Sequence, residues 1–438
     1  MKKCLILLTI LASLTSHIQA QTDKIEIANE LGKQAAEFLQ KSEFEKLHAL
    51  FSEDKATSIS FAQMEKILSG TLKQFGPLNE INELQVKKTA EGNYYQQAVS
   101  FEEGKFFLTF TLNENNRFTS FMFKPYQAQY NWTAPDYASD SSKYFEQEVT
   151  IGDSMKLNGV FVFPSSPNFE TIVVFVHGSG PNDMDETLGP NKLFKDLAYG
   201  LAANGIASLR YNKRTYDYPS AMAKQANSLT IQQVVVNDAV SAINMARVID
   251  QKKVILLGHS LGGYCAPMIA ESAKPDAVIV LAGNVSPLED ILVPQFEHIK
   301  KNDTSTTINE FQMAMIRTQV KRIQDNEYDA ETAPPLLPLG LPASFWLSIK
   351  EYEPQKLARK QAFPYLILNG ERDYQVTPKE AKKWKDGSKN KHSKTIIYPK
   401  LNHIFFEGEG ICLPSEYEKE GHFSEQVLKD IINWINEI

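Results

Sequence analysis

The chain has 438 residues, of which 42% are hydrophobic and 23% are charged, a balance typical of globular proteins with sizeable cores. This length predicts two domains. The formal net charge is −7, and the densest basic stretch, residues 379–400, is interrupted by Glu380 and Asp386. Binding to nucleic-acid phosphates needs clustered Lys and Arg, so the composition argues against a nucleic-acid partner.

Residues 1–20 have the pattern of a signal peptide. Two lysines precede an apolar run over residues 4–14, and small or polar residues then lead to Ala20. The run is about half of the ~20 apolar residues that a membrane span requires. Cys4 precedes this run, whereas a lipid anchor needs a cysteine after it. We therefore expect an exported protein with no stable membrane span, whose net charge becomes −9 once both lysines are removed.

The next hundred residues predict a small α+β domain over residues 22–125. Apolar residues recur at helical spacing from about 23 to 85, and they alternate with polar residues from 94 to 123. Asn113-Glu114-Asn115-Asn116 predicts a turn within a meandering antiparallel sheet. Residues 126–142 are rich in Pro, Tyr, Ser, Ala and Asp, show neither period and predict a linker.

Residues 143–438 alternate short Val/Ile/Leu runs with helical segments, which indicates a mostly parallel sheet covered by helices. Capping-box patterns at Thr230-x-x-Gln233 and Thr377-Pro378-x-Glu380 predict two of the helix starts. The segment 285–360, with helical runs at 287–300, 307–325 and 343–360, interrupts this alternation and is expected to form a cap. Eight strands are predicted, the first two as a hairpin: 144–151, 156–163, 171–177, 205–211, 252–258, 277–283, 363–369 and 394–399.

Gly258-His259-Ser260-Leu261-Gly262 lies between the predicted strand 252–258 and a predicted helix. This placement matches a nucleophile elbow, in which serine occupies a sharp strand-to-helix turn. Glycines two residues on each side leave room where a Cβ would clash. A phosphate cradle is the alternative for such a turn, but the Gly-Lys-Ser/Thr ending is missing. Ser260 is therefore the predicted nucleophile.

The predicted strand 171–177 runs into His177-Gly178-Ser179-Gly180-Pro181. In hydrolases this loop supplies one backbone N–H to the developing oxyanion, and the residue after the nucleophile supplies the other. We expect Ser179 and Leu261 to be these donors and His177 to shape the loop without acting as a base. Several nearby charged residues are expected to form a solvated loop or structural ion pairs, with no metal site: Asp183, Asp185, Glu186, Arg210, Lys213 and Arg214.

Functional groups in a parallel sheet gather at the carboxyl ends of its strands. Asp373 and His403 each follow a predicted strand and are the predicted acid and base of the triad. Glu371 is the reserve candidate for the acid. The weaker candidates for the acid are Glu289 and Asp290, and those for the base are His298, His392 and His422. The chain order Ser260, Asp373, His403 also matches one known arrangement of a catalytic triad. His403 would move the proton and Asp373 would orient its ring, so no metal or organic cofactor is required.

With these residues placed, the chain resembles the EstD-like bacterial carboxylesterases, α/β-hydrolases with an extra N-terminal domain. The motifs that carry this resemblance are His177 to Pro181, Gly258 to Gly263, Gly370 to Asp373 and Asn402-His403. It implies the α/β-hydrolase fold and ester hydrolysis by Ser260, Asp373 and His403. The leader resembles that of a Gram-negative periplasmic protein. Dienelactone-hydrolase-like relatives, by contrast, use cysteine as the nucleophile.

The leading hypothesis is a carboxylesterase for short acyl or aryl esters, a small-molecule substrate class. It is motivated by the triad and by cap aromatics that could contact substrate or form the core of the cap: Phe296, Phe311, Phe345, Trp346 and Tyr352. A serine peptidase or aminopeptidase of the same fold is the enzymatic alternative, and a binding protein on a hydrolase scaffold is the other. For Cys265 and Cys412 we expect two separate thiols in preference to a disulfide.

Overall fold

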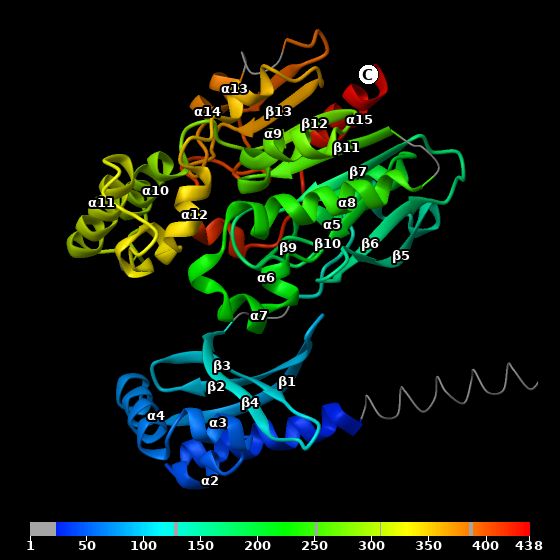
Figure 1. Cartoon of the computed structure of the whole chain (residues 1–438). Coiled ribbons are helices and arrows are strands. Elements are labelled where there is room, and N and C mark those ends of the chain that lie inside the picture. The colour runs from blue at the N-terminus through cyan, green and yellow to red at the C-terminus, as the bar shows by residue number, and fades with distance from the viewer. Residues whose placement is uncertain (1–22, 127–129, 250–252, 307, 385–388) are drawn as a thin grey trace, which may run out of the picture. The chain divides into compact units, whose positions relative to one another are not determined.

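The computed structural model describes residues 23–126, 130–249, 253–306, 308–384 and 389–438 (Figure 1). The chain divides into two compact units, Met1–Ala128 and Gln129–Ile438. The predicted signal peptide, residues 1–20, lies outside the described residues. No helix in the described ranges combines the length and hydropathy needed to cross a bilayer.

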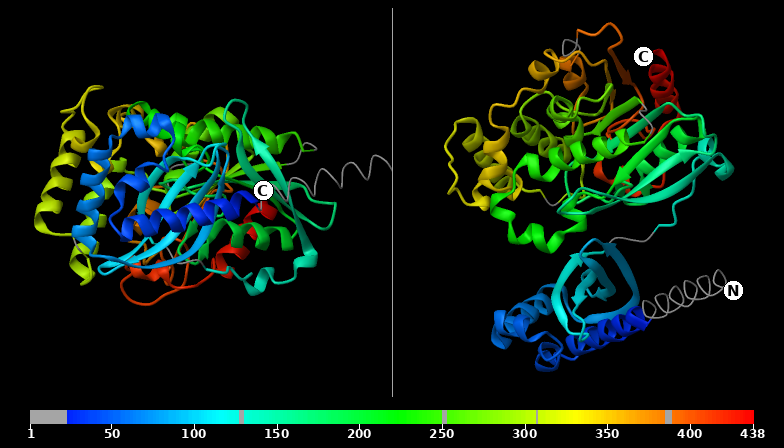
Figure 2. Two further views of the ribbon diagram at one scale, coloured as in Figure 1. Left: turned by 90° about the horizontal axis from the view of Figure 1, so that it is seen from below. Right: turned by 45° about the vertical axis from the view of Figure 1, so that its right-hand side comes forward.

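The N-terminal unit packs helices against a curved four-stranded sheet (Figure 2, right). Residues 23–40 are helical, and α4 starts with a capping box between Ser60 and Gln63. The strands form an antiparallel meander, β1-β2-β3-β4, and Asn113 accepts backbone hydrogen bonds in its predicted turn. The labelled elements are α2 Phe44–His48, α3 Glu53–Ser58, α4 Phe61–Phe75, β1 Leu78–Thr89, β2 Gly92–Phe101, β3 Gly104–Leu112 and β4 Phe118–Pro125.

The helical pattern predicted up to residue 85 is wrong from Leu78 onward, because β1 begins there. Gly76, with φ 76°, ends α4 in a conformation that favours glycine, and Pro77 follows. The register of β1 shifts between Leu78 and Glu80 and again between Ile81 and Leu84. These irregularities place apolar residues three apart in an extended strand, which imitates helical spacing.

The second unit contains all eight predicted strands in one sheet, ordered β14-β13-β12-β11-β7-β10-β6-β5. Strands β5 and β6 form the predicted antiparallel hairpin, β6 pairs antiparallel with β10, and the other neighbours are parallel. A small extra hairpin, β8–β9, was not predicted. The strands are β5 Tyr144–Ile151, β6 Leu157–Pro164, β7 Thr171–Val176, β8 Thr187–Leu188, β9 Asn191–Lys192, β10 Ala207–Tyr211, β11 Lys253–His259, β12 Ala277–Leu281, β13 Tyr365–Gly370 and β14 Lys394–Tyr398.

Helices cover both faces of this sheet, which confirms the α/β-hydrolase fold class (Figure 1). Alternate strand residues serve opposite faces: Val174 packs in one core with α8 and α9, and Phe175 packs in the other with α5 and α15. The α-helices outside the cap are α5 Leu193–Ala203, α6 Arg214–Asp217, α7 Pro219–Lys224, α8 Asn237–Arg247, α9 Leu261–Ala273, α14 Pro378–Trp384 and α15 Glu425–Glu437. The short helical turns there are η1 Asp136–Ala138, η2 Ser141–Lys143, η3 Ala226–Ser228, η4 Gln232–Val236 and η7 Pro414–Glu418.

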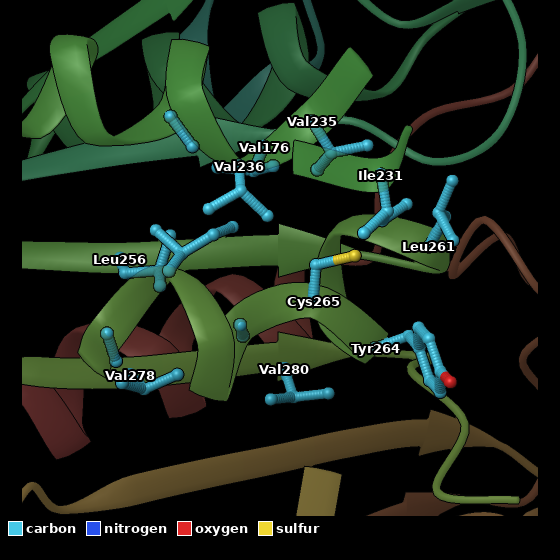
Figure 3. Close-up of a cluster of buried hydrophobic side chains, with 14 of the residues drawn as sticks. Val176, Ile231, Val235, Val236, Leu256, Leu261, Tyr264, Cys265, Val278 and Val280 are labelled. Atoms are coloured by element: carbon cyan, nitrogen blue, oxygen red, sulfur yellow. The ribbon is translucent and has the colours of Figure 1, made fainter. Parts of the chain in front are cut away.

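Both cysteines of this unit are buried free thiols. Cys265 lies on α9 among Ile231, Val235 and Val236 in the first core (Figure 3). Burial raises the pKa of its thiol to about 12, so the group behaves as a small apolar side chain. The expectation of two separate thiols is confirmed.

The predicted linker, residues 126–142, is packed against the hydrolase unit from residue 130 onward. Trp132 Nε1 donates a hydrogen bond to Asp196 Oδ1 at 2.8 Å, and the Tyr137 hydroxyl donates to the Phe423 carbonyl at 2.9 Å. The segment therefore has a fixed path although it forms neither a long helix nor a strand, because its side chains hydrogen-bond to residues far away in the chain.

The cap comprises α10 Leu288–Asn302, α11 Glu310–Gln324, η5 Pro334–Leu336, η6 Pro338–Gly340, α12 Ala343–Ile349 and α13 Pro354–Ala358. The single helix expected over 343–360 is therefore two helices, because Glu353 is extended before Pro354. Helix α14 begins at Pro378 as predicted. Glu380 differs from the expected capping box, since its carboxylate accepts hydrogen bonds from Val285 and Ser286.

The N-terminal unit has its own apolar core, in which Phe110 is fully buried beside Phe118. We expect Phe110→Ala to destabilise this unit by about 3–5 kcal/mol, because a large buried side chain is lost. Hydrogen exchange should then speed up in residues 23–126 and stay unchanged in 130–438. Met122→Ala, at an exposed position of β4, is the control. Equal acceleration in both units would contradict separate cores.

Candidate functional site

Ser260 occupies a strained turn between β11, which ends at His259, and α9, which begins at Leu261. Its φ of 53° and ψ of −115° are unfavourable for serine, at a cost of about 1–3 kcal/mol. A Cβ on Gly258 would collide with the Gly262 carbonyl, and one on Gly262 would collide with the Val176 carbonyl. The expected need for glycine at both positions is confirmed.

A cavity of about 440 Å³ brings together four of the residues predicted for the site: Ser179, Ser260, Leu261 and His403 all line it. Leu261 is the first residue of α9, so its N–H has no acceptor within the helix. Ser179 lies on the loop after β7, beside the elbow. The cavity thus combines a serine, an imidazole and two backbone segments that can donate to an anion.

Asp373 lies behind His403, away from the cavity. Its Oδ2 is 2.7 Å from His403 Nδ1, and its Oδ1 accepts hydrogen bonds from the backbone of Gln375 and Val376 at 2.8 and 2.9 Å. Donation from Nδ1–H to the carboxylate leaves Nε2 as the ring nitrogen that can accept a proton. The two residues follow β13 and β14, as the rule on strand ends predicts.

The other candidates for the acid and the base lie outside the cavity. Glu371 is exposed. His298 stacks on Tyr374 with a ring distance of 4.6 Å, and His422 lies 3.2 Å from Asp196. Like His392, Glu289 and Asp290, none of these residues is among the described residues that line the cavity.

His177 is buried, with 1% of its surface exposed, and its ring packs against Phe194 and Tyr211. Burial lowers its pKa to about 4, so the ring is neutral near pH 7. It does not line the cavity. These contacts agree with the expected role of His177 in shaping the loop.

Several of the charged residues around the loop form structural ion pairs, which was one of the two alternatives expected for them. Asp185 pairs with Arg210 and, at 2.8 Å, with Lys192. Arg214 pairs with Asp238. No three His, Cys, Asp or Glu side chains converge as metal ligands anywhere in the described ranges.

Glu186 differs from these neighbours because it reaches the site itself. Its Oε1 accepts a hydrogen bond from Gly178 N at 2.6 Å, and its Oε2 lies 3.1 Å from His259 Nδ1. His259 Nε2 lies 3.1 Å from the His403 carbonyl oxygen. Sequence reasoning missed this link, because Glu186 and His259 are far apart in the chain and neither follows a recognisable spacing.

Glu186 and His259 stabilise each other as an ion pair. Burial alone would raise the pKa of Glu186, but the imidazolium of His259 holds it below its usual value. Burial alone would lower the pKa of His259, and the carboxylate raises it instead. Both ring nitrogens of His259 have an oxygen nearby, since Nδ1 lies 3.1 Å from Glu186 Oε2 and Nε2 lies 3.1 Å from the His403 carbonyl oxygen.

The cap supplies most of the apolar wall of the cavity. The apolar lining residues from the cap and the β13–α14 loop are Leu288, Ile291, Leu292, Phe296, Leu339 and Val376. Of the five cap aromatics, only Phe296 lines the cavity: Phe345 and Trp346 are buried in the core, Tyr352 bonds to the Tyr264 carbonyl, and Phe311 is 73% exposed. The cap aromatics are therefore mainly structural.

Comparisons with known proteins agree with this architecture. Residues 168–409 match the family described as serine aminopeptidase, S33, and residues 33–121 match a family of unknown function, DUF3887. Over 394 residues the chain is 32% identical to Esterase EstD of Thermotoga maritima, covering 90% of this chain and 91% of that protein. The chain belongs to the α/β-hydrolase family that includes EstD.

Two solved structures are similar over part of the chain. Est1E from Butyrivibrio proteoclasticus is 16% identical with a TM-score of 0.43, covering 66% of this chain and 99% of Est1E. A soluble variant of monoglyceride lipase from Saccharomyces cerevisiae is also 16% identical with a TM-score of 0.43, covering 72% of this chain and 99% of that one.

The neutral state of His177 gives a testable pH dependence. Its pKa is about 4 in the folded protein and 6.5, the ordinary value, in the unfolded chain. As the pH falls, the unfolded chain therefore binds a proton before the folded protein does. Its contribution to stability is complete above pH 6.5 and falls by up to about 3 kcal/mol as the pH drops to 4. His177→Phe should remove this loss. Urea unfolding at pH 7 and 4.5 checks it, and equal losses in both proteins would refute the assignment.

Proposed function

We propose that this protein is an exported serine carboxylesterase that cleaves short acyl or aryl esters in the periplasm or outside the cell. Ser260 is the nucleophile, His403 the general base and acid, and Asp373 the residue that orients the imidazole. One observation carries the proposal: the strained Ser260 shares a cavity with His403, whose far nitrogen is held by the buried Asp373.

The reaction proceeds in two steps. The Ser260 hydroxyl oxygen attacks the ester carbonyl while its proton passes to His403 Nε2. The tetrahedral intermediate collapses, and the alcohol leaves with the proton from His403, giving the acyl-enzyme. Water then attacks the acyl-enzyme with the same proton transfers and releases the carboxylic acid and Ser260. Asp373 stays ionised throughout and stabilises the imidazolium.

Negative charge develops on the carbonyl oxygen during both steps. In this proposal the N–H groups of Ser179 and Leu261 receive it: both residues line the cavity, and Leu261 adds the partial positive charge at the start of α9. Removing one such donor costs about 3–4 kcal/mol in known hydrolases. The donors are backbone groups, so the fold of both loops sets their strength.

The cavity lining favours esters over peptides with a free amino terminus. Such a terminus is an ammonium ion, which needs a carboxylate partner when it is buried. Among the described residues, Glu186 is the only carboxylate that lines the cavity, and it already binds Gly178 and pairs with His259. The apolar cap wall suits an uncharged acyl or aryl group, and EstD is itself named an esterase.

The first test is hydrolysis of p-nitrophenyl acetate and butyrate by the mature protein. We expect Ser260→Ala to lower kcat at least about 1,000-fold, because the nucleophile is removed. Ser241→Ala, on α8, should leave kcat unchanged.

A fluorophosphonate probe should label the wild type and not Ser260→Ala, because the reaction needs an activated serine. Full activity of Ser260→Ala would overturn the triad. Faster turnover of aminoacyl p-nitroanilides than of esters would establish the aminopeptidase alternative, and an unlabelled, inactive wild type would indicate a binding protein.

The cap wall should set the acyl length. Leu292 is buried and lines the cavity, so Leu292→Ala opens space for a longer chain. We expect the ratio of kcat/KM for p-nitrophenyl hexanoate over butyrate to rise about 4-fold or more, since each buried methylene contributes about 0.8 kcal/mol. Leu347→Ala, at an exposed cap position outside the cavity, should not change this ratio. No change in Leu292→Ala would place the acyl group elsewhere.

A further inference from the structure

The loop that carries Ser179 is held at Gly178 by two buried charged side chains. Lys213 Nζ donates a hydrogen bond to the Gly178 carbonyl oxygen at 2.7 Å, and the Glu186 carboxylate accepts from the Gly178 N–H at 2.6 Å. Only 5% of Lys213 and 9% of Glu186 is exposed. Both peptide groups that flank the Gly178 Cα are therefore bound to a charged group.

Peptide geometry transmits the Lys213 contact to Ser179. The carbonyl of Gly178 and the N–H of Ser179 belong to one planar trans peptide group, in which they point in opposite directions. Lys213 Nζ at 2.7 Å, with Asn182 Nδ2 at 3.3 Å, fixes the direction of the carbonyl and therefore also the direction of the N–H. The Ser179 N–H points away from Lys213, and Ser179 lines the cavity.

The charge of Lys213 also strengthens this donor. Burial lowers the pKa of its amine to about 8, with Glu186, Asp238 and Cys265 as the neighbouring titratable groups, so the amine is protonated at pH 7. A cation bonded to a carbonyl oxygen withdraws electron density from the amide and makes its N–H a better donor. The Lys213 backbone N–H also binds the loop, through the Asn182 carbonyl at 3.1 Å.

Glu186 extends the same arrangement to the catalytic base. Its carboxylate contacts His259, and His259 Nε2 lies 3.1 Å from the carbonyl oxygen of His403. The rings of His259 and His403 are 4.9 Å apart. One continuous set of buried polar contacts thus joins the oxyanion loop, the residue before the nucleophile and the residue that carries the base.

We infer that Lys213 and Glu186 are positioning residues of the oxyanion hole, which hold the peptide groups of Gly178 so that the Ser179 N–H faces the developing oxyanion. This inference rests on the proposed esterase function. Neither side chain touches the reacting atoms: Lys213 acts through the peptide plane, and Glu186 acts through Gly178 and His259.

The experiment compares Lys213→Met, Glu186→Ala and Glu186→Gln with the wild type on p-nitrophenyl butyrate. Rates are divided by the number of sites that a fluorophosphonate labels at completion, so an unfolded fraction does not count. Lys213→Met and Glu186→Ala should lower kcat per labelled site about 10- to 100-fold, somewhat less than the loss of a whole donor, with KM within about 3-fold.

Glu186→Gln is the informative conservative variant. Its amide oxygen can still accept from Gly178, and its NH₂ group can face a neutral His259, so the hydrogen bond that holds Gly178 survives while the charge is removed. We expect kcat within about 5-fold of the wild type, because the oxyanion hole responds to the position of Gly178. The affinity for a trifluoromethyl ketone, which mimics the oxyanion, should fall in parallel with kcat across the three variants.

Asp196→Asn is the matched control, since Asp196 is also a buried carboxylate that accepts a backbone hydrogen bond, from Phe423, and lies outside the cavity. It should lower stability and leave kcat per labelled site unchanged. The inference is overturned if Lys213→Met keeps kcat within about 3-fold of the wild type, or if Glu186→Gln loses as much as Glu186→Ala. Failure of the proposed function would look different, because the wild type itself would then neither label nor hydrolyse esters.

Discussion

The close approach of three backbone segments at the end of β7 and β11 is the constraint on which the site depends. Gly258 pairs with Val176 across these parallel strands, and Gly262 packs directly against the Val176 carbonyl. This contact forces the chain to reverse within one residue, which gives Ser260 its left-handed φ. The strained turn persists because the paired strands and α9 hold both of its ends. The loop that carries Ser179 starts from the same strand end, so the proposed nucleophile and the proposed oxyanion donor are held by the same pair of strands.

Two carboxylate–imidazole pairs, Asp373–His403 and Glu186–His259, lie next to each other at these strand ends and differ in their surroundings. Asp373 binds one nitrogen of His403 and leaves the other facing the cavity. Glu186 contacts His259, whose second nitrogen faces a backbone carbonyl. The first pair leaves one ring nitrogen open to the cavity for proton exchange, whereas both ring nitrogens of the second lie close to oxygen atoms of the protein. We therefore propose that the first pair takes part in proton transfer and that the second pair fixes the geometry of the site.

The proposed catalytic residues and the apolar wall of the cavity come from different parts of the fold. Ser260, Asp373 and His403, the proposed triad, follow β11, β13 and β14, whose hydrogen-bonded register fixes their separation. The apolar wall comes largely from α10 and η6, which are held by side-chain packing in the cap. Such packing tolerates changes of size better than a register does.

Much of the hydrolase unit was determined by local sequence. Buried runs such as residues 171–176 predict strands because both faces of a parallel strand need apolar side chains, and all eight strands are present. The elbow around Ser260 is a contiguous motif. The positions of Asp373 and His403 follow from the rule that parallel strands end at one edge. In the N-terminal unit the helical start and the antiparallel sheet over residues 94–123 were also predicted, because their periods are regular.

Only the tertiary structure decided the features that depend on distant partners. The bulges of β1 disturb the alternation of its apolar and polar residues, and only its antiparallel pairing with β2 shows that it is a strand. Of the cap aromatics, Phe296 alone faces the cavity, because that choice depends on how α10 packs over the sheet. Glu186 and Lys213 belong to loops after different strands and meet only at Gly178. No local sequence pattern indicates these contacts, because they form only when two loops fold against the same buried peptide group.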